Sequence, residues 1–263
     1  MSGFQCLASR NLVTKAKDLG SISEEVFASP QVELDEEKRS REDGGFTGQR
    51  MAVICCVNHF TYASAALKTM GFDVTCWTGT VPSVEVLEDV LSKSSQLWII
   101  STDKDIFPVP IRQVIKNFHQ RGGALYLWGD NDPYNAAVNP VIADVMPGIY
   151  LHGNYHACQY VHPRKSASAA GFDVHLIFTG VEKLYEGETI ARFGGTNPRL
   201  RFIMSSTEPL PALGICDDNL GGCGRLAIDV GFTRLVCSWD DAGTSKFVKN
   251  IAAWLCNLDS DWI

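Results

Sequence analysis

Long apolar runs are absent from this sequence. No stretch approaches the ~20 consecutive apolar residues that a transmembrane helix requires. Residues 1–20 also lack the apolar core of a secretory signal. We therefore expect a soluble, cytoplasmic protein that does not associate with a membrane. The alternative is a mitochondrial presequence, because Arg10, Lys15 and Lys17 all precede the first acidic residue, Asp18.

Paired cysteine motifs and basic runs are missing as well. The nine cysteines are an odd number without CxxC spacing, and most lie inside apolar runs. This usage is typical of small buried side chains in a reducing compartment rather than of a disulfide framework. The net charge of −7 and the mixing of arginines with acids at residues 39–43 disfavour a nucleic-acid partner.

The amino-acid composition is that of an ordinary globular protein. Hydrophobic residues make up 45% and charged residues 20%, and a chain of 263 residues can bury a full core. The charged string from Glu33 to Asp43 is followed by Gly44-Gly45, which reads as a linker. We therefore expect a flexible polar N-terminal arm at residues 1–48 and one α/β domain at residues 49–263.

From Met51 onward, apolar runs alternate with amphipathic stretches. The run at 51–57 has no polar alternation, which indicates a strand buried on both faces. Further strands are predicted at 72–77, 96–100 and 124–128, and helices at 61–70, from Ser83, at 110–119 and at 133–145. Four successive strand–helix units indicate right-handed crossovers and a doubly wound, mostly parallel sheet.

The pattern changes after Gly148. Short extra strands are predicted between residues 149 and 210, at 149–151, 174–178, 189–193 and 200–204. We expect them to extend the sheet edge or to form a small β insertion. A last core strand is predicted at 224–229, and an amphipathic helix at 244–255 closes the domain.

Polar residues gather where the predicted core strands end. In an open α/β sheet, ligands bind outside the carboxyl ends of the strands, near the switch in strand order. The candidate ligand-binding residues are Asn58, Ser101, Asp103, Asp130, Asn131, Asp132, Asn154 and Asp229. Such loops also need helix caps, and Asp132 before Pro133 has the pattern of an N-cap. Capping and turn formation are therefore the alternative role for these side chains.

The order of elements, the turn after the fourth strand and the ending carry a family resemblance. The ending runs from Gly224 to Phe232 and continues with Asn250-Ile-Ala-Ala-Trp254-Leu255. Over residues 51–258 the chain resembles the class I glutamine amidotransferase-like superfamily, which has a flavodoxin-like fold. The ending is most similar to divergent branches that include trehalose-utilisation-type and intraflagellar-transport-type domains.

The resemblance does not extend to the catalytic residues. Amidotransferases of this class carry a Gly-x-Cys-x-Gly nucleophile in the turn that here reads Gly129-Asp130-Asn131-Asp132, without Cys or Ser. They also carry a late His-x-Glu pair, and no histidine follows His175 here. A thiolate nucleophile needs an adjacent base. The resemblance therefore implies a pseudoenzyme from a branch that lacks the nucleophilic Cys.

Two functions follow as hypotheses. The first is a non-catalytic or cryptic domain that binds a small polar ligand or a protein partner; the carboxylates and amides suit a polyol, sugar or cation better than a phosphorylated anion. The alternative is a metal-assisted hydrolase that uses Asp130, Asp132 and Asp229, because carboxylate oxygens suit Mg²⁺ or Ca²⁺ and a bound metal activates water. A divalent metal is the only cofactor that this hypothesis requires.

Two further chemistries fit the sequence less well. Asp130-x-Asp132 also resembles the aspartyl nucleophile motif of haloacid-dehalogenase-like phosphatases, but Tyr134 stands where that family expects Thr or Val. Zinc binding is the other candidate, through His152, His156, Cys158 and His162. His152 and His156 are four residues apart, which suits zinc on a helix, whereas the even spacing of the last three puts their side chains on one face of a strand.

Overall fold

The computed structural model describes residues 44–166, 168–217 and 222–257. An eight-stranded sheet lies at its centre, in the order β2-β1-β3-β4-β12-β11-β10-β7. The parallel strands are β1 (Arg50–Cys55), β2 (Asp73–Thr78), β3 (Gln96–Ile100), β4 (Ala124–Trp128) and β12 (Leu226–Asp229). The described part of the chain is therefore an α/β fold with a large, mostly parallel central sheet, as the sequence predicts.

The inner parallel strands are buried on both faces. Every residue of β3, β4 and β12 is buried, and so is every residue of β1 after Arg50. Continuous burial is typical of parallel strands that helices cover on both sides. Strand β2 lies at the edge of the sheet and is partly exposed along its length.

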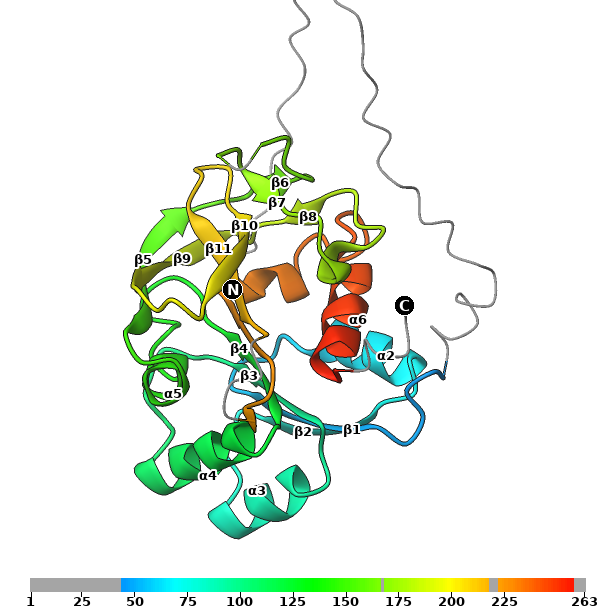
Figure 1. The fold of residues 1–263 in the computed structure, drawn as a ribbon, viewed down its shortest axis with the longest axis vertical. Helices are drawn as coiled ribbons and strands as arrows, with labels where there is room; N and C mark the ends of the chain where they lie inside the picture. Colours follow the sequence, from blue (N-terminus) through cyan, green and yellow to red (C-terminus); the bar gives the residue numbers. More distant parts are fainter. Residues whose placement is uncertain (1–43, 167, 218–221, 258–263) are drawn as a thin grey trace, which may run out of the picture. The chain divides into compact units, whose positions relative to one another are not determined.

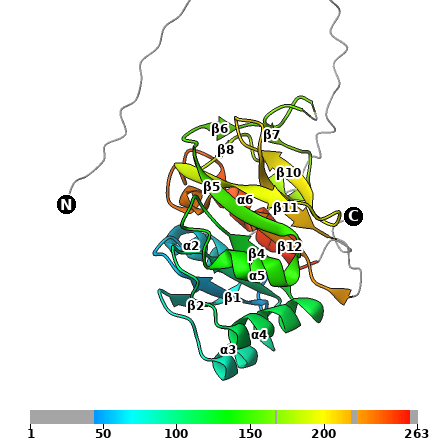
Figure 2. The same cartoon turned by 90° about the vertical axis from the view of Figure 1, so that its left-hand side faces the viewer.

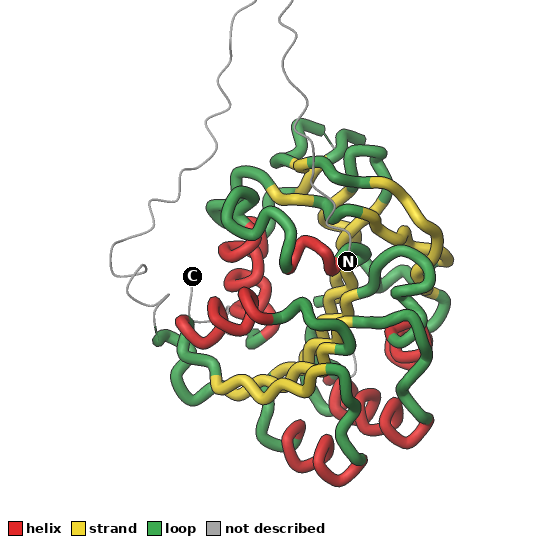
Figure 3. The backbone as a smooth tube through the Cα atoms, turned by 180° about the vertical axis from the view of Figure 1, so that it is seen from behind, coloured by secondary structure: helices red, strands yellow, loops and turns green. Residues whose placement is uncertain are grey.

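The helices form two groups. Helix α2 (Thr61–Thr69) packs against α6 (Thr244–Leu255), while α4 (Val109–Gln120) packs against both α3 (Val84–Leu91) and α5 (Val138–Val145). Figures 1 and 3 show the two groups on opposite faces of the parallel strands. Ser83 caps α3, as predicted, because its hydroxyl accepts a hydrogen bond from Val86 N (3.4 Å). Among the described helices, none is long and apolar enough to cross a membrane.

The second half of the chain adds antiparallel strands. Strands β11 (Pro211–Cys216), β10 (Arg201–Ser205) and β7 (Gly171–Phe172) extend the central sheet beyond β12 (Figure 2). Strand β5 (Ile149–His156) pairs with β9 (Thr189–Gly195), and β6 (Tyr160–Val161) pairs with β8 (Leu184–Tyr185). These two pairs are separate from the central sheet. The second half of the chain therefore extends the edge of the central sheet and also forms two small separate sheets, which are the two arrangements expected from the sequence.

Two local predictions are wrong, and one buried strand has no counterpart among the predicted elements. Residues 174–178 are not a strand, because Leu176–Phe178 form a 3₁₀ helix in which the His175 ring accepts a hydrogen bond from Ile177 N (3.2 Å). The helix after β4 begins at Val138 rather than Pro133. Strand β11 was not predicted, although it is almost entirely buried between β10 and β12.

The turn at residues 44–48 packs on the domain. Gly44 N donates to Thr69 O (3.1 Å) and Phe46 N donates to Met70 O (2.9 Å). The Phe46 ring is buried and stacks on Phe72, with ring centroids 4.8 Å apart. Residues 44–48 of the expected N-terminal arm thus pack on the domain, and residues 1–43 lie outside the described residues.

Candidate functional site at the carboxyl ends of the parallel strands

The loops that follow β1, β3, β4 and β12 meet at one edge of the sheet, and we name this edge the carboxyl-end rim. The strand order reverses between β1 and β3, because β2 lies on one side of β1 and β3 on the other. Backbone bonds continue past the strand ends: Ser101 N donates to Trp128 O (2.9 Å) and Gly129 N donates to Asp229 O (2.9 Å). These bonds fix the loop backbones where open α/β sheets bind ligands.

Asp130 occupies the turn after β4, where the superfamily resemblance places the nucleophile. Its side chain is 1% exposed. One carboxylate oxygen accepts a hydrogen bond from Asn131 N (2.8 Å) and the other accepts one from Thr233 N (3.2 Å). Burial raises the pKa of Asp130 to about 7, although both hydrogen bonds and the charge of Arg234 act in the opposite direction. This carboxyl group is therefore buried and hydrogen-bonded to the backbone, and its pKa lies near neutral pH.

Asp229, at the end of β12, belongs to a fully buried ionic cluster. Its carboxylate lies 3.3 Å from Arg234 Nη2 and accepts hydrogen bonds from Tyr126 Oη (3.1 Å) and Gly231 N (3.0 Å). Arg234 also donates to the carbonyl oxygens of Gly231 (3.1 Å) and Glu186 (2.8 Å). Burial raises the pKa of Asp229, and the Arg234 charge opposes that rise. These groups satisfy one another, which is how charged groups are tolerated in a protein interior.

Ser101 and Asp132 make local structural hydrogen bonds. The buried Ser101 hydroxyl accepts from Val138 N (3.1 Å), the first residue of α5. The Asp132 carboxylate accepts from Asn135 Nδ2 (2.6 Å) and from Gly153 N (2.6 Å), so it joins the loop after β4 to strand β5. Asp132 therefore does not cap a helix that starts at Pro133.

Of the four remaining predicted ligand-binding residues, Asn131 forms a hydrogen bond within the protein, and Asn58, Asp103 and Asn154 are exposed. Asn131 Oδ1 accepts from Thr189 Oγ1 (2.8 Å) on β9. Asn58 lines a separate hollow of about 390 Å³ between α2 and β2, and Asn154 is exposed on β5. Asp103 is exposed and accepts a hydrogen bond from the Thr102 hydroxyl (3.2 Å). Five of the eight predicted residues, Ser101, Asp130, Asn131, Asp132 and Asp229, thus bind other groups of the protein, and the remaining three are exposed.

The rim also carries an aromatic group that is not among the residues expected from the sequence. The Phe232 ring, after β12, is 3% exposed and lies between two other rings. His59, after β1, meets it edge-on at a centroid distance of 5.7 Å, and Tyr134, after β4, meets it edge-on at 6.3 Å. Tyr134 is 41% exposed, and the Nδ1 atom of His59 is buried without a hydrogen-bond partner among the described residues. The available signal was three ring side chains next to strand ends that are otherwise polar.

A thiol near the rim does not replace the missing nucleophile. Cys237 Sγ donates to the Glu188 carboxylate (3.4 Å). Burial, and next the hydrogen bond to Glu188, raise the pKa of Cys237 to about 11. The reactive species of cysteine is the thiolate, so a thiol with a raised pKa is a weak nucleophile.

The described residues do not assemble a metal site. No group of three or more His, Cys, Asp or Glu side chains in them is placed to hold a metal ion. Asp130, Asp132 and Asp229 each bind protein donors instead, and His162 Nδ1 lies 3.1 Å from the backbone oxygen of Glu182. This geometry supports neither the phosphatase-like nor the zinc interpretation of the sequence.

Comparison with known proteins identifies the fold. No protein-family model matches the chain, and no curated protein matches it in sequence. The structure is similar to the mmIFT52 N-terminal domain, with a TM-score of 0.58 and 14% identity, over 79% of this chain and 97% of that one. It is also similar to a cytoplasmic protein from Salmonella typhimurium, with a TM-score of 0.54 and 12% identity, over 79% and 98% of the two chains.

A putative ThuA-like protein from Bacteroides uniformis is a third neighbour. Its TM-score is 0.52 at 10% identity, over 80% of this chain and 91% of that one. Similarity at such low identity concerns the fold and not the activity. ThuA-like proteins have amidotransferase-like folds, so the resemblance inferred from the sequence is confirmed at that level. The described domain has an amidotransferase-like α/β fold.

Proposed function

We propose that this domain binds a small polar ligand at the carboxyl-end rim and does not carry out the glutaminase reaction of its superfamily. In this proposal it is a doubly wound, flavodoxin-like member of a divergent branch without the nucleophilic Cys. It acts as a cytoplasmic binding protein.

The argument against catalysis rests on Asp130. A nucleophile must present an activated atom to the substrate. At the corresponding turn, both Asp130 carboxylate oxygens accept backbone hydrogen bonds and the side chain is 1% exposed. Asp229, at the matching late strand end, is bonded to Arg234 and Tyr126. Both acids therefore stabilise the loops rather than face a substrate.

The observation that carries the binding proposal is the group formed by His59, Phe232 and Tyr134. Three rings from three different strand ends meet there, and the part of the chain that the structure describes offers no hydrogen-bond partner to His59 Nδ1. Ligand sites characteristically combine aromatic walls with a few polar groups that fix orientation. An unpaired buried ring nitrogen costs free energy unless a ligand or water satisfies it.

The charge of the rim restricts the ligand. The exposed acids Asp103, Asp105 and Glu188 on the surrounding loops outnumber the exposed Lys104 beside them, so their net negative charge would repel a phosphorylated compound. Carboxylate and ring nitrogen acceptors suit hydroxyl and ammonium donors, and the exposed Tyr134 ring can pack against an apolar face or a cation. We therefore propose a polyol, a sugar or an amine as the ligand class.

Thermal shift with a compound panel tests the proposal. A ligand that binds the native state raises Tm by mass action. We expect a neutral polyol, a sugar or an amine to raise the Tm of the wild type and of Tyr150→Ala, but not of Tyr134→Ala. Tyr150 is a matched control because it is 50% exposed and lies on β5 opposite Gly194.

The other outcomes separate the remaining hypotheses. A rise with phosphorylated compounds alone would contradict the proposed ligand chemistry. A rise with a divalent metal that is lost in Asp130→Ala would favour the metal-assisted hydrolase. If no compound shifts Tm, the small-ligand proposal fails and a protein partner becomes the hypothesis to test.

A further inference from the structure

Two thiols that are 79 residues apart in the sequence lie against the same residue, Glu188. Cys158 Sγ donates to the backbone oxygen of Glu188 (3.5 Å), and Cys237 Sγ donates to its carboxylate (3.4 Å). Cys158 follows β5 and is exposed, whereas Cys237 follows the 3₁₀ helix Phe232–Leu235 and is half-buried. Neither thiol belongs to the aromatic group that carries the proposed function.

Backbone hydrogen bonds hold the two thiol-bearing segments on either side of Glu188. Cys158 N donates to Gly187 O (2.8 Å), which fixes the first segment beside the residue that precedes Glu188. On the other side, Glu188 N donates to Thr233 Oγ1 (3.0 Å), and Cys237 N donates to Thr233 O (2.9 Å). Both thiols are therefore placed by the backbone around one short stretch of chain.

The two segments also contact each other directly. Tyr160, two residues after Cys158, has its hydroxyl 3.0 Å from that of Ser238, which follows Cys237. Each segment contains a non-glycine residue at positive φ, Cys158 at 56° and Ser238 at 53°. Such a conformation is costly for a residue with a side chain and persists only where the surroundings hold it in place. The neighbouring Cys158 also contributes to the raised pKa of Cys237, after burial and Glu188.

We propose that Cys158 and Cys237 are a reversible dithiol site that takes small disulfides as its reagents. In reducing compartments, cysteine pairs that oxidise do so transiently and act in redox sensing or catalysis. Both cysteines are free thiols in this structure, and one of them is open to a small molecule. Cys158 reacts first, because it is exposed and because the proton of Cys237 is held by the Glu188 carboxylate.

The reaction consists of two exchange steps. The Cys158 thiolate attacks one sulfur of the small disulfide, which breaks its S–S bond and releases one thiol. Cys237 then attacks Cys158 Sγ, which forms the bond between the two cysteines and releases the second thiol. The two cysteines are oxidised, the small disulfide is reduced to two thiols, and these thiols take up the two cysteine protons. The new bond joins the end of β5 to the segment after β12, which includes Phe232 of the rim.

Incubation of the full chain with oxidised glutathione tests the proposal. Unreacted thiols are blocked with iodoacetamide, and the unreduced digest is analysed by mass spectrometry until the exposed Cys76 on β2 carries glutathione. We expect a peptide pair joined through Cys158 and Cys237, with the loss of two hydrogen atoms. Dithiothreitol should convert the pair back to two thiols. Cys76 is the control that shows that the reagent has reacted.

Two single substitutions separate the two steps. In Cys237→Ser, Cys158 should keep its bound glutathione, because no second thiol displaces it. In Cys158→Ser, Cys237 should stay a thiol while Cys76 reacts, because the first step requires the exposed cysteine. In the wild type, thiols or lasting glutathione at both positions once Cys76 has reacted would overturn the proposal. A disulfide that joins either cysteine to a different one would overturn it as well.

Discussion

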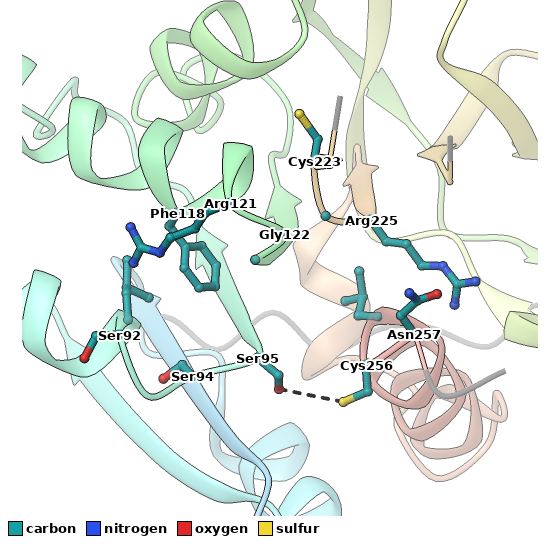
Figure 4. A pocket seen from close by; sticks show the side chains of 15 residues that line it. Ser92, Ser94, Ser95, Phe118, Arg121, Gly122, Cys223, Arg225, Cys256 and Asn257 are labelled. Atoms are coloured by element: carbon teal, nitrogen blue, oxygen red, sulfur yellow. Dashed lines mark hydrogen bonds between the residues drawn. The ribbon is translucent and has the colours of Figure 1, made fainter. Parts of the chain in front are cut away.

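Two groups of charged residues, one at each end of the parallel strands, differ in burial. At the carboxyl end, Asp130, Asp229 and Arg234 are almost completely buried, and their polar atoms bind backbone groups or one another. At the amino end, Arg121 is exposed and Arg225 is half-buried, and each guanidinium group lies over an aromatic ring. The buried groups hold the fold together, whereas the two arginines line a cavity of about 460 Å³ beside the amino ends of β3, β4 and β12 (Figure 4).

The largest effect is expected from breaking the buried cluster with Arg234→Met. This change leaves Asp229 buried beside no cation and removes two hydrogen bonds to backbone oxygens. Removing one partner of a buried pair typically costs about 3–5 kcal/mol. We expect the free energy of unfolding, measured by urea denaturation, to fall by that amount.

Arg201→Met is the matched control for that prediction. Arg201 lies 3.3 Å from Asp217, but the two side chains are 51% and 45% exposed. Such a surface pair contributes about 0–1 kcal/mol. If the free energy of unfolding fell equally in Arg234→Met and Arg201→Met, the buried cluster of Asp229 and Arg234 would not stabilise the fold more than a surface ion pair.

The second prediction concerns pH and uses Asp130→Asn. The pKa of Asp130 is raised from 3.8 to about 7 by burial. Between those values the folded state keeps a proton that the unfolded state has released, so the free energy of unfolding decreases as pH rises through this window and levels off above it. Asn does not titrate. The stability of the variant relative to wild type should therefore increase from about pH 4 to about pH 7, by at most roughly 4 kcal/mol.

Asp103→Asn is the control, because Asp103 is exposed on the same rim. The difference between Asp103→Asn and wild type, measured over the same pH range, is the baseline for the Asp130→Asn curve. A pH-independent difference for Asp130→Asn would mean that the buried carboxyl group is already ionised in the folded protein across this range.

The sequence predicts the parallel half of the fold better than the antiparallel half. Strands β3 and β4 are continuous apolar runs bounded by turn residues, so they are recognisable on their own. Strand β11 contains Pro211 and Gly214 and was overlooked, yet it is almost entirely buried, because its neighbours β10 and β12 supply the packing. Local propensity is a weak guide where tertiary contacts decide the conformation.

For the candidate site, the sequence predicts where the polar side chains lie, but not whether their polar atoms are free to bind a ligand. It places polar residues at the strand ends, and the structure has them there. It does not reveal that Ser101 is bonded to the start of α5, or that Asp132 is bonded to β5, because those partners are distant in the chain. The aromatic group was missed for the same reason, since His59 and Phe232 are 173 residues apart and meet only through the sheet order.

The smallest effect is expected at the amino end, from Arg121→Ala. Its guanidinium group makes a cation–π contact with Phe118 at the surface, and such contacts are worth about 0.5–1 kcal/mol. The free energy of unfolding should therefore fall by no more than about 1 kcal/mol, in contrast to the loss in Arg234→Met. If Arg121→Ala instead destabilised the chain as much as Arg234→Met, arginines at both ends would be structural. The difference in structural role between the two groups of charged residues would then be contradicted.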